Sequence, residues 1–318
     1  MAGIPIIQIR GSSAVVYSER LFSSAHSRLF ARQNMSKIRK GRYSGRMTEG
    51  ARKRLSKAIC LLVQSAKPSW ITNTVTGRLH YHRLSFITLT IASDKNITAR
   101  QGYDLLLNHF LDWLTRTKGV KSFIWKAELQ TRGQLHYHIT VPNFIDHREI
   151  RDKWNELQHR AGLLDGFFQK FGHYKPPSTD IADVRKVRNM ERYLIKELAK
   201  SIDARLAGIR KKVSRMVYTG EIDAADAKAK TEELMSAALT TEGRLWGCSN
   251  NLSKGKYFDM VLENRHDDKI NQWKAAGNVR EVRGDFFSIL YFEDIDIEQL
   301  FDPSERKRFH EHIRGICQ

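Results

Sequence analysis

Cysteine is scarce, and its spacing excludes two classes of protein. Cys60, Cys248 and Cys317 are odd in number and far apart. Zinc sites need closely spaced cysteines and disulfide scaffolds need paired ones, so neither is expected, and a reducing cytoplasm is the simplest environment. Long hydrophobic runs are also missing. No apolar stretch approaches the about 20 residues that cross a bilayer, so no membrane partner is expected.

Acidic residues are few relative to basic ones, above all near the N-terminus. The 318 residues contain 54 Lys and Arg against 35 Asp and Glu, a formal net charge of +19. Residues 1–60 carry thirteen basic residues and two acids, so 13 − 2 leaves +11 in this part alone. This excess favours polyanionic partners through counterion release, and nucleic acid is the expected one. The residues expected to face DNA here are Lys37, Arg39, Lys40, Arg42, Arg52, Lys53 and Arg54.

Hydrophobic periodicity predicts an α+β chain. Strands are expected at 84–91, 122–129, 135–141 and 179–184, because β-branched and apolar residues alternate there. Helical spacing of apolar residues predicts helices at 98–117, 146–159 and 187–206, and a further helix whose apolar face follows the cations at 52–54. Two charged helices joined at Thr219-Gly220 are expected over 205–240. Strands and helices in this order indicate an antiparallel sheet packed against helices.

A hairpin at 122–141 places three metal-binding side chains together. On a strand, residues i and i+2 point to the same face, so His136 and His138 project together and Tyr137 points away. If the hairpin turns about Arg132, Glu128 lies directly opposite His136 on the same face. A carboxylate and two imidazoles form a mixed oxygen and nitrogen ligand set, which suits Mn²⁺, with Mg²⁺ as the alternative.

The helix at 187–206 carries a tyrosine and two lysines in one stripe. Tyr193, Lys196 and Lys200 follow i, i+3 and i+7 spacing, beside an apolar face that would dock on the sheet. A tyrosine at the edge of an amphipathic helix is most often a packing residue. Taken alone, the stripe does not decide between a catalytic and a structural role.

Taken together, these segments resemble the HUH endonuclease superfamily, and within it the rolling-circle replication initiators of phages and plasmids. Phe86-Ile-Thr-Leu-Thr matches the first motif, His136-Tyr137-His138 the second, and Tyr193-Leu-Ile-Lys196 the tyrosine motif. The resemblance covers about residues 84–204, with a weaker similarity at Arg244-Leu-Trp-Gly-Cys-Ser-Asn-Asn-Leu. It implies a ferredoxin- or RRM-like antiparallel sheet with helices on one face.

The resemblance also implies a chemistry. Tyr193 would attack a phosphodiester of single-stranded origin DNA and remain attached to the 5′ end, with Lys196 beside the phosphate. Glu128, His136 and His138 would hold Mn²⁺ or Mg²⁺, and Lys200 would contact DNA. The cytoplasm of a bacterial host is the implied location. No Gly-x-x-x-x-Gly-Lys-Ser/Thr segment is present, so host helicase and polymerase are the implied partners.

Two points stay open in the sequence. Glu197 stands where a second tyrosine is found in some relatives, so the joining step would need a second protomer or an activated water. A single-strand transposase of the same superfamily, or a nucleic-acid-binding module without catalysis, would share parts of the pattern.

The expected domains are a basic N-terminal extension with a DNA-facing helix at 1–75, a nuclease domain at 76–204, and a helical hairpin with an accessory region at 205–318. The Ser- and Arg-rich residues 1–34 are expected to lie in a poorly ordered extension.

Overall fold

The computed structural model describes residues 4–19, 49–72, 77–93, 95, 97–129, 135–183, 201–239, 244–285, 287–293 and 295–317. The chain forms two compact units. The central unit comprises Ser44–Lys254 with Cys317–Gln318, and the flanking unit joins Met1–Tyr43 to Gly255–Ile316. No helix in the described ranges is long and apolar enough to span a bilayer.

The central unit is built on one five-stranded antiparallel sheet. Its strands are β5 (Ser85–Thr90), β6 (Ile124–Leu129), β7 (Leu135–Val141), β8 (Thr179–Asp183) and β9 (Trp246–Cys248). They follow the spatial order β8-β5-β7-β6-β9, and each neighbouring pair is antiparallel. Without β9, this is the order of a split βαβ, ferredoxin-like sheet. The predicted α+β class with an antiparallel sheet is confirmed.

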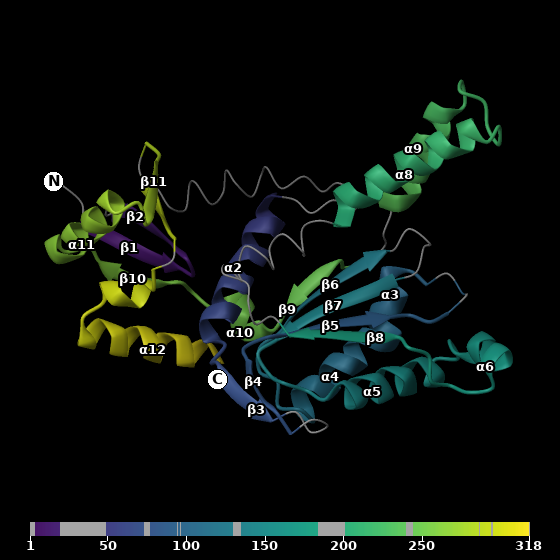
Figure 1. Cartoon of the computed structure of the whole chain (residues 1–318), viewed down its shortest axis with the longest axis horizontal. Helices are drawn as coiled ribbons and strands as arrows, with labels where there is room; N and C mark the ends of the chain where they lie inside the picture. Colours follow the sequence, from purple (N-terminus) through teal and green to yellow (C-terminus); the bar gives the residue numbers. More distant parts are fainter. Residues whose placement is uncertain are drawn as a thin grey trace, which may run out of the picture. The chain divides into compact units, whose positions relative to one another are not determined.

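Helices cover one face of this sheet. The first is continuous through α3 (Ala99–Gly102), a π-helical stretch η1 (Tyr103–Leu107) and α4 (Asn108–Arg116). The second, α5 (His147–Arg160), begins at Asp146, whose carboxylate caps it by accepting from the Arg148 backbone N–H. Figure 1 shows α4 and α5 beneath the strands. The core between them and the sheet includes Tyr137, Trp154 and Phe110.

Gly102 lets the first helix approach the sheet closely. An added Cβ there would lie 2.5 Å from the Tyr137 hydroxyl and 2.6 Å from Leu135 Cδ2. Both neighbours belong to β7, so neither can move without disturbing the strand that carries the histidines. We expect Gly102→Ala to lower the free energy of unfolding by about 1–3 kcal/mol through overpacking, measured by urea denaturation with tryptophan fluorescence.

Gly50 provides the matched control for that substitution. It lies in α2 (Glu49–Ser65), where an added Cβ would have only the end of the Arg54 side chain nearby, at 3.7 Å. Alanine is the better helix former, so Gly50→Ala should leave stability unchanged or raise it. Equal stability of Gly102→Ala and the unchanged chain would contradict the close-packing account.

Several helices and a ribbon complete the central unit. Leu55, Ile59 and Leu62 are buried on α2, as the apolar spacing predicts. The remaining elements are α6 (Asp165–Phe171), α8 (Ser201–Tyr218), α9 (Ala227–Leu239), α10 (Asn250–Lys254), and a two-stranded ribbon of β3 (Ser69–Thr72) and β4 (Leu79–His82). The charged helix pair expected over 205–240 is therefore confirmed as α8 and α9.

The segment 246–254 belongs with the central sheet and not with an accessory region. β9 pairs with β6, and the Ser249 hydroxyl accepts from the Phe123 backbone N–H at 3.3 Å. Asn251 Nδ2 donates to Ser122 Oγ at 2.8 Å, which joins α10 to the start of β6. The expected boundary at residue 204 misses this strand because three residues are too short for an alternating pattern.

The flanking unit joins the two ends of the chain in a second antiparallel sheet of order β10-β1-β2-β12-β11. It contains β1 (Ile4–Arg10), β2 (Ser13–Glu19), β10 (Phe258–Val261), α11 (Asn264–Ala275), β11 (Val279–Arg283), β12 (Phe287–Phe292), a 3₁₀ turn η2 (Ile297–Leu300) and α12 (Pro303–Cys317).

The expectation of a poorly ordered extension is therefore wrong for residues 4–19. Ile7 and Ile9 are fully buried, and β1 pairs along its length with β2 and with β10. The expected N-terminal domain at 1–75 is divided: its strands belong to the flanking unit and its helix α2 to the central one. The partner strands lie more than 230 residues away, for example Ile7 opposite Met260, so local pattern could not reveal them.

Candidate active site

The strand register brings the candidate metal ligands onto one face of the central sheet. Glu128 lies directly opposite His136, and on the other side His136 faces Thr90. One register step along, His138 lies between Lys126 and Thr88. The predicted cross-strand pairing of Glu128 with His136 is confirmed.

Side-chain contacts tie these residues together. His138 Nε2 lies 3.1 Å from Glu128 Oε2, and this is the contact that joins a ligand on β6 to one on β7. The Nδ1 atoms contact two threonine hydroxyls of β5: His138 Nδ1 lies 3.2 Å from Thr88 Oγ1, and His136 Nδ1 lies 3.3 Å from Thr90 Oγ1. The threonines orient both rings and leave their Nε2 edges turned away from β5.

The surroundings shift two of the pKa values. The hydrogen bond with His138 is the largest cause that lowers the pKa of the Glu128 carboxyl, so this group is a carboxylate at neutral pH. Burial is the largest cause that lowers the pKa of the His136 imidazole, which favours the neutral ring. The site therefore presents an anionic oxygen donor beside neutral nitrogen.

The donor set suits a divalent cation, although it is not gathered as a closed site. Carboxylate oxygen and imidazole nitrogen are ligands of Mn²⁺, and threonine partners on the far ring nitrogen are the usual second shell of ligating histidines. Across the described ranges, no group of three or more His, Cys, Asp and Glu side chains is arranged to hold a metal ion. Glu128 and His138 are already in contact, so His136 is the member that would have to turn toward them.

Tyr137 is directed to the opposite face, as expected for the residue between the two histidines. Its side chain is fully buried and packs edge to face against Trp125 and Trp154. Burial raises the pKa of its hydroxyl. Tyr137 is therefore a core residue that DNA cannot reach.

Three further residues of this face were missed by sequence reasoning as members of the site. Lys126 is buried beside the ligands and contributes to lowering the pKa of Glu128. Thr88 and Thr90 hold the imidazoles. A signal was present for the threonines: their i, i+2 spacing on a predicted strand copies that of the histidines, so the two pairs match once the strands are neighbours.

The other expected site residues divide into two sets. Arg52, Lys53 and Arg54 lie exposed on the first turns of α2, with Lys53 paired to Glu49 at 2.8 Å. The remainder fall outside the described residues, and these are Lys37, Arg39, Lys40, Arg42, Tyr193, Lys196 and Lys200.

Comparison with known proteins supplies one match. Residues 84–202 match the model of a family of replication-associated proteins, described as the ORF2 and gene 2 protein type. This range is 119 of 318 residues, so less than half of the chain. No curated protein and no solved structure matches significantly. The matched range contains β5 to β8, Glu128 and both histidines. The central part of the chain is thus similar to a family of replication-associated proteins, which indicates a protein of the replication-initiator type.

Proposed function

We propose that this protein initiates rolling-circle replication by nicking single-stranded DNA at an origin and forming a covalent 5′-phosphotyrosine. The observation that carries the proposal is the cross-strand convergence of Glu128, His136 and His138 on one sheet face. That face lies inside the range that is similar to replication-associated proteins. The Tyr-x-x-Lys segment at Tyr193 and Lys196 falls in the same range.

Glu128, His136 and His138 are the residues that would hold the cation, with Mn²⁺ preferred and Mg²⁺ as the alternative. When bound, the cation would offset the negative charge that makes a phosphodiester a poor electrophile. The protein prepares for this with its threonines. In the structure, an Nε2–H of His138 can donate to Glu128 while Nδ1 accepts from Thr88. In the other tautomer, Nδ1–H donates to the same hydroxyl and Nε2 carries the lone pair that a cation needs.

Tyr193 supplies the nucleophile in this proposal. Its oxygen forms a bond to phosphorus, the bond between phosphorus and the 3′ oxygen breaks, and the tyrosine proton leaves to the medium while the 3′ oxygen is protonated. Because one ester replaces another, the bond can later be exchanged without ATP. Lys196, one helical turn away, would carry positive charge beside the phosphate. The free 3′-hydroxyl would serve a host polymerase, with a host helicase opening the duplex.

Lys126 supports the same reading of this face. A cation buried beside a carboxylate and two imidazoles adds positive charge where a DNA phosphate would approach. The exposed cations of α2 would then follow the phosphate backbone outside the site, because backbone contacts supply most of the sequence-independent affinity for DNA.

A covalent-adduct assay tests the proposal directly. The purified chain is incubated with Mn²⁺ and end-labelled oligonucleotides that tile the replicon, followed by denaturing electrophoresis. We expect a labelled band that migrates with the protein, that requires a 5′-phosphate on the retained fragment, and that disappears with EDTA. Tight DNA binding without an adduct on any oligonucleotide would instead support a binding module without catalysis.

A further inference from the structure

The β3–β4 ribbon presents an apolar face that nothing else in the proposed site uses. Trp70 pairs with Tyr81 and Thr72 with Leu79, so these four side chains share one face. Trp70 is 69% exposed, Leu79 65% and Tyr81 39%. The Trp70 and Tyr81 rings meet edge to face at 5.8 Å, which holds the pair in position and leaves ring surface open to solvent.

The opposite face of the ribbon is anchored to the central sheet. His80 and His82 both pack against the Phe144 ring, each at 5.8 Å between centroids. His82 Nε2 lies 3.0 Å from the Ser85 hydroxyl, which in turn donates to the Asn143 carbonyl. Ser85 begins β5, and Asn143 and Phe144 follow β7. The ribbon is thereby attached to the two strands that carry the threonines and the histidines.

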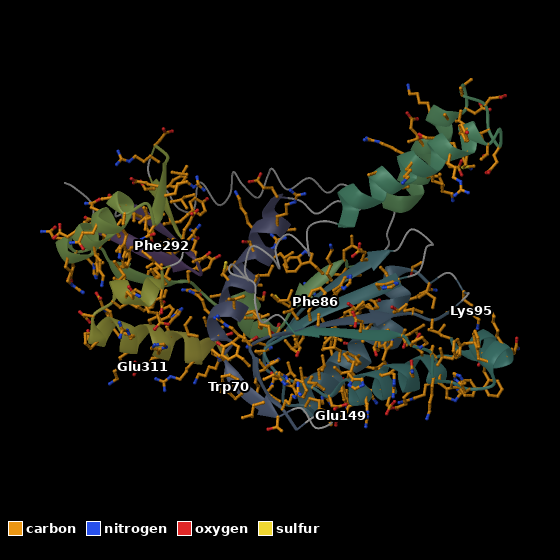
Figure 2. The ribbon with its side chains drawn as sticks, viewed as in Figure 1. Trp70, Phe86, Lys95, Glu149, Phe292 and Glu311 are labelled. Carbon is orange, nitrogen blue, oxygen red and sulfur yellow. The ribbon has the colours of Figure 1, made fainter. Side chains whose placement is uncertain are left out.

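Phe86 lies between the ribbon and the candidate metal ligands along the sheet. Its ring stacks on the His138 imidazole, with centroids 5.3 Å apart and planes 22° from parallel. Phe86 is the next residue after Ser85, which contacts His82 at the base of the ribbon. Figure 2 marks Trp70 on the ribbon and Phe86 on the sheet. Aromatic rings thus occur both beside the histidines and beyond the end of the same strands.

The charge around the ribbon identifies the occupant. Residues 50–93 contain no Asp or Glu and seven basic residues. Within the ribbon region, Lys67 and Arg78 are exposed at its two ends. An apolar face with cations and no acids matches a polyanion that carries flat apolar groups. Single-stranded DNA has this chemistry, whereas a second protein would need its own excess of acidic residues.

We propose that the outer face of the β3–β4 ribbon is a stacking platform for unpaired bases of single-stranded DNA. Trp70 stacks on a base, Tyr81 supports it edge-on, and Lys67 and Arg78 contact the flanking phosphates. The inference rests on the proposed function for the identity of the ligand. It adds a place outside the cleavage site where the substrate strand is held, in line with base–aromatic stacking in other single-strand binders.

Equilibrium binding in EDTA tests the platform separately from cleavage. Fluorescence anisotropy is measured with a labelled single-stranded oligonucleotide and with the matching duplex, using the full chain. Stacking is worth about 1–3 kcal/mol per base, so Trp70→Ala should weaken single-strand binding about 5- to 150-fold and leave duplex binding nearly unchanged. Trp70→Phe should restore most of the affinity. Trp70→Leu should not, because leucine keeps apolar bulk without a stacking face.

Phe171→Ala is the matched control, since Phe171 is an aromatic residue of the same unit with 53% exposure that belongs to α6. It should bind single strands as the unchanged chain does. Cross-linking of an iodouracil-substituted oligonucleotide to Trp70 or Tyr81, located by mass spectrometry, would support the platform independently of affinity.

The possible failures are distinguishable. Unchanged single-strand affinity in Trp70→Ala, in a protein that still forms the covalent adduct, would overturn the platform and leave the proposed function standing. Wild-type affinity in Trp70→Leu would overturn stacking in favour of a general apolar contact. Concentration-dependent self-association that Trp70→Ala abolishes, without any change in DNA binding, would assign the face to a second copy of the chain. Absence of DNA binding by the unchanged protein would overturn both proposals.

Discussion

Tyr193→Phe is expected to abolish the covalent protein–DNA adduct while leaving the affinity for single-stranded DNA within about twofold. Phenylalanine keeps the ring and loses only the oxygen that would form the bond to phosphorus. Removal of a catalytic nucleophile commonly costs on the order of a million-fold in rate, so no labelled band should survive on the gel. Binding depends on phosphate and base contacts that the substitution does not remove.

Two other tyrosines make this prediction specific. Tyr218→Phe is the matched control because Tyr218 is 92% exposed at the end of α8, so loss of its hydroxyl should change neither folding nor cleavage. Tyr137 belongs to the histidine motif, yet its burial in the core removes it as a rival nucleophile. An adduct that persists in Tyr193→Phe would show that another residue attacks the phosphate, and peptide mapping of the adduct would identify it.

His138→Ala is expected to remove Mn²⁺ binding and to reduce nicking by at least about 100-fold. Loss of a partner that merely orients a ligand typically costs 10- to 100-fold in metal affinity or activity, and His138 is proposed as a ligand itself. His138 also makes the contact with Glu128 and the stacking contact with Phe86. Mn²⁺ binding is measured by electron paramagnetic resonance of the free ion, independently of cleavage.

His109→Ala is the matched control for that experiment. His109 lies exposed on α4, the helix that packs on the opposite face of the sheet, so its loss should leave both Mn²⁺ binding and nicking unchanged. Circular dichroism confirms that each variant is folded. If His138→Ala bound Mn²⁺ with unaltered affinity and stoichiometry, the ligand assignment would be wrong, whatever happened to the rate.

Much of the central sheet could be predicted because its signals are local. The hairpin of β6 and β7 is closed by a short turn, so counting outward from Arg132 places Glu128 opposite His136, as the register shows. The helix cap at Asp146 follows equally from neighbouring residues, since a carboxylate one residue before a helix accepts from its first free N–H groups. Such features depend on interactions within about ten residues of the chain.

Other features required partners that are distant in sequence. No local pattern could place Thr88 and Thr90 against the two histidines, because β5 meets β7 only through an intervening helix and hairpin. The anchoring of the β3–β4 ribbon on Phe144 also joins residues more than 60 positions apart. The exposed face of Trp70 became visible only when the other face was seen to be covered.

By itself, the sequence determined the charge, the antiparallel α+β class, the face shared by Glu128, His136 and His138, and the similarity to replication initiators. Tertiary structure decided which strands complete each sheet. It joined residues 4–19 to the C-terminal strands, added β9 to the central sheet, and left Glu128 and His138 in contact without closing the site around His136. The physical reason is that alternation specifies which side of a strand is buried, whereas the choice of its neighbour depends on packing between surfaces from distant parts of the chain.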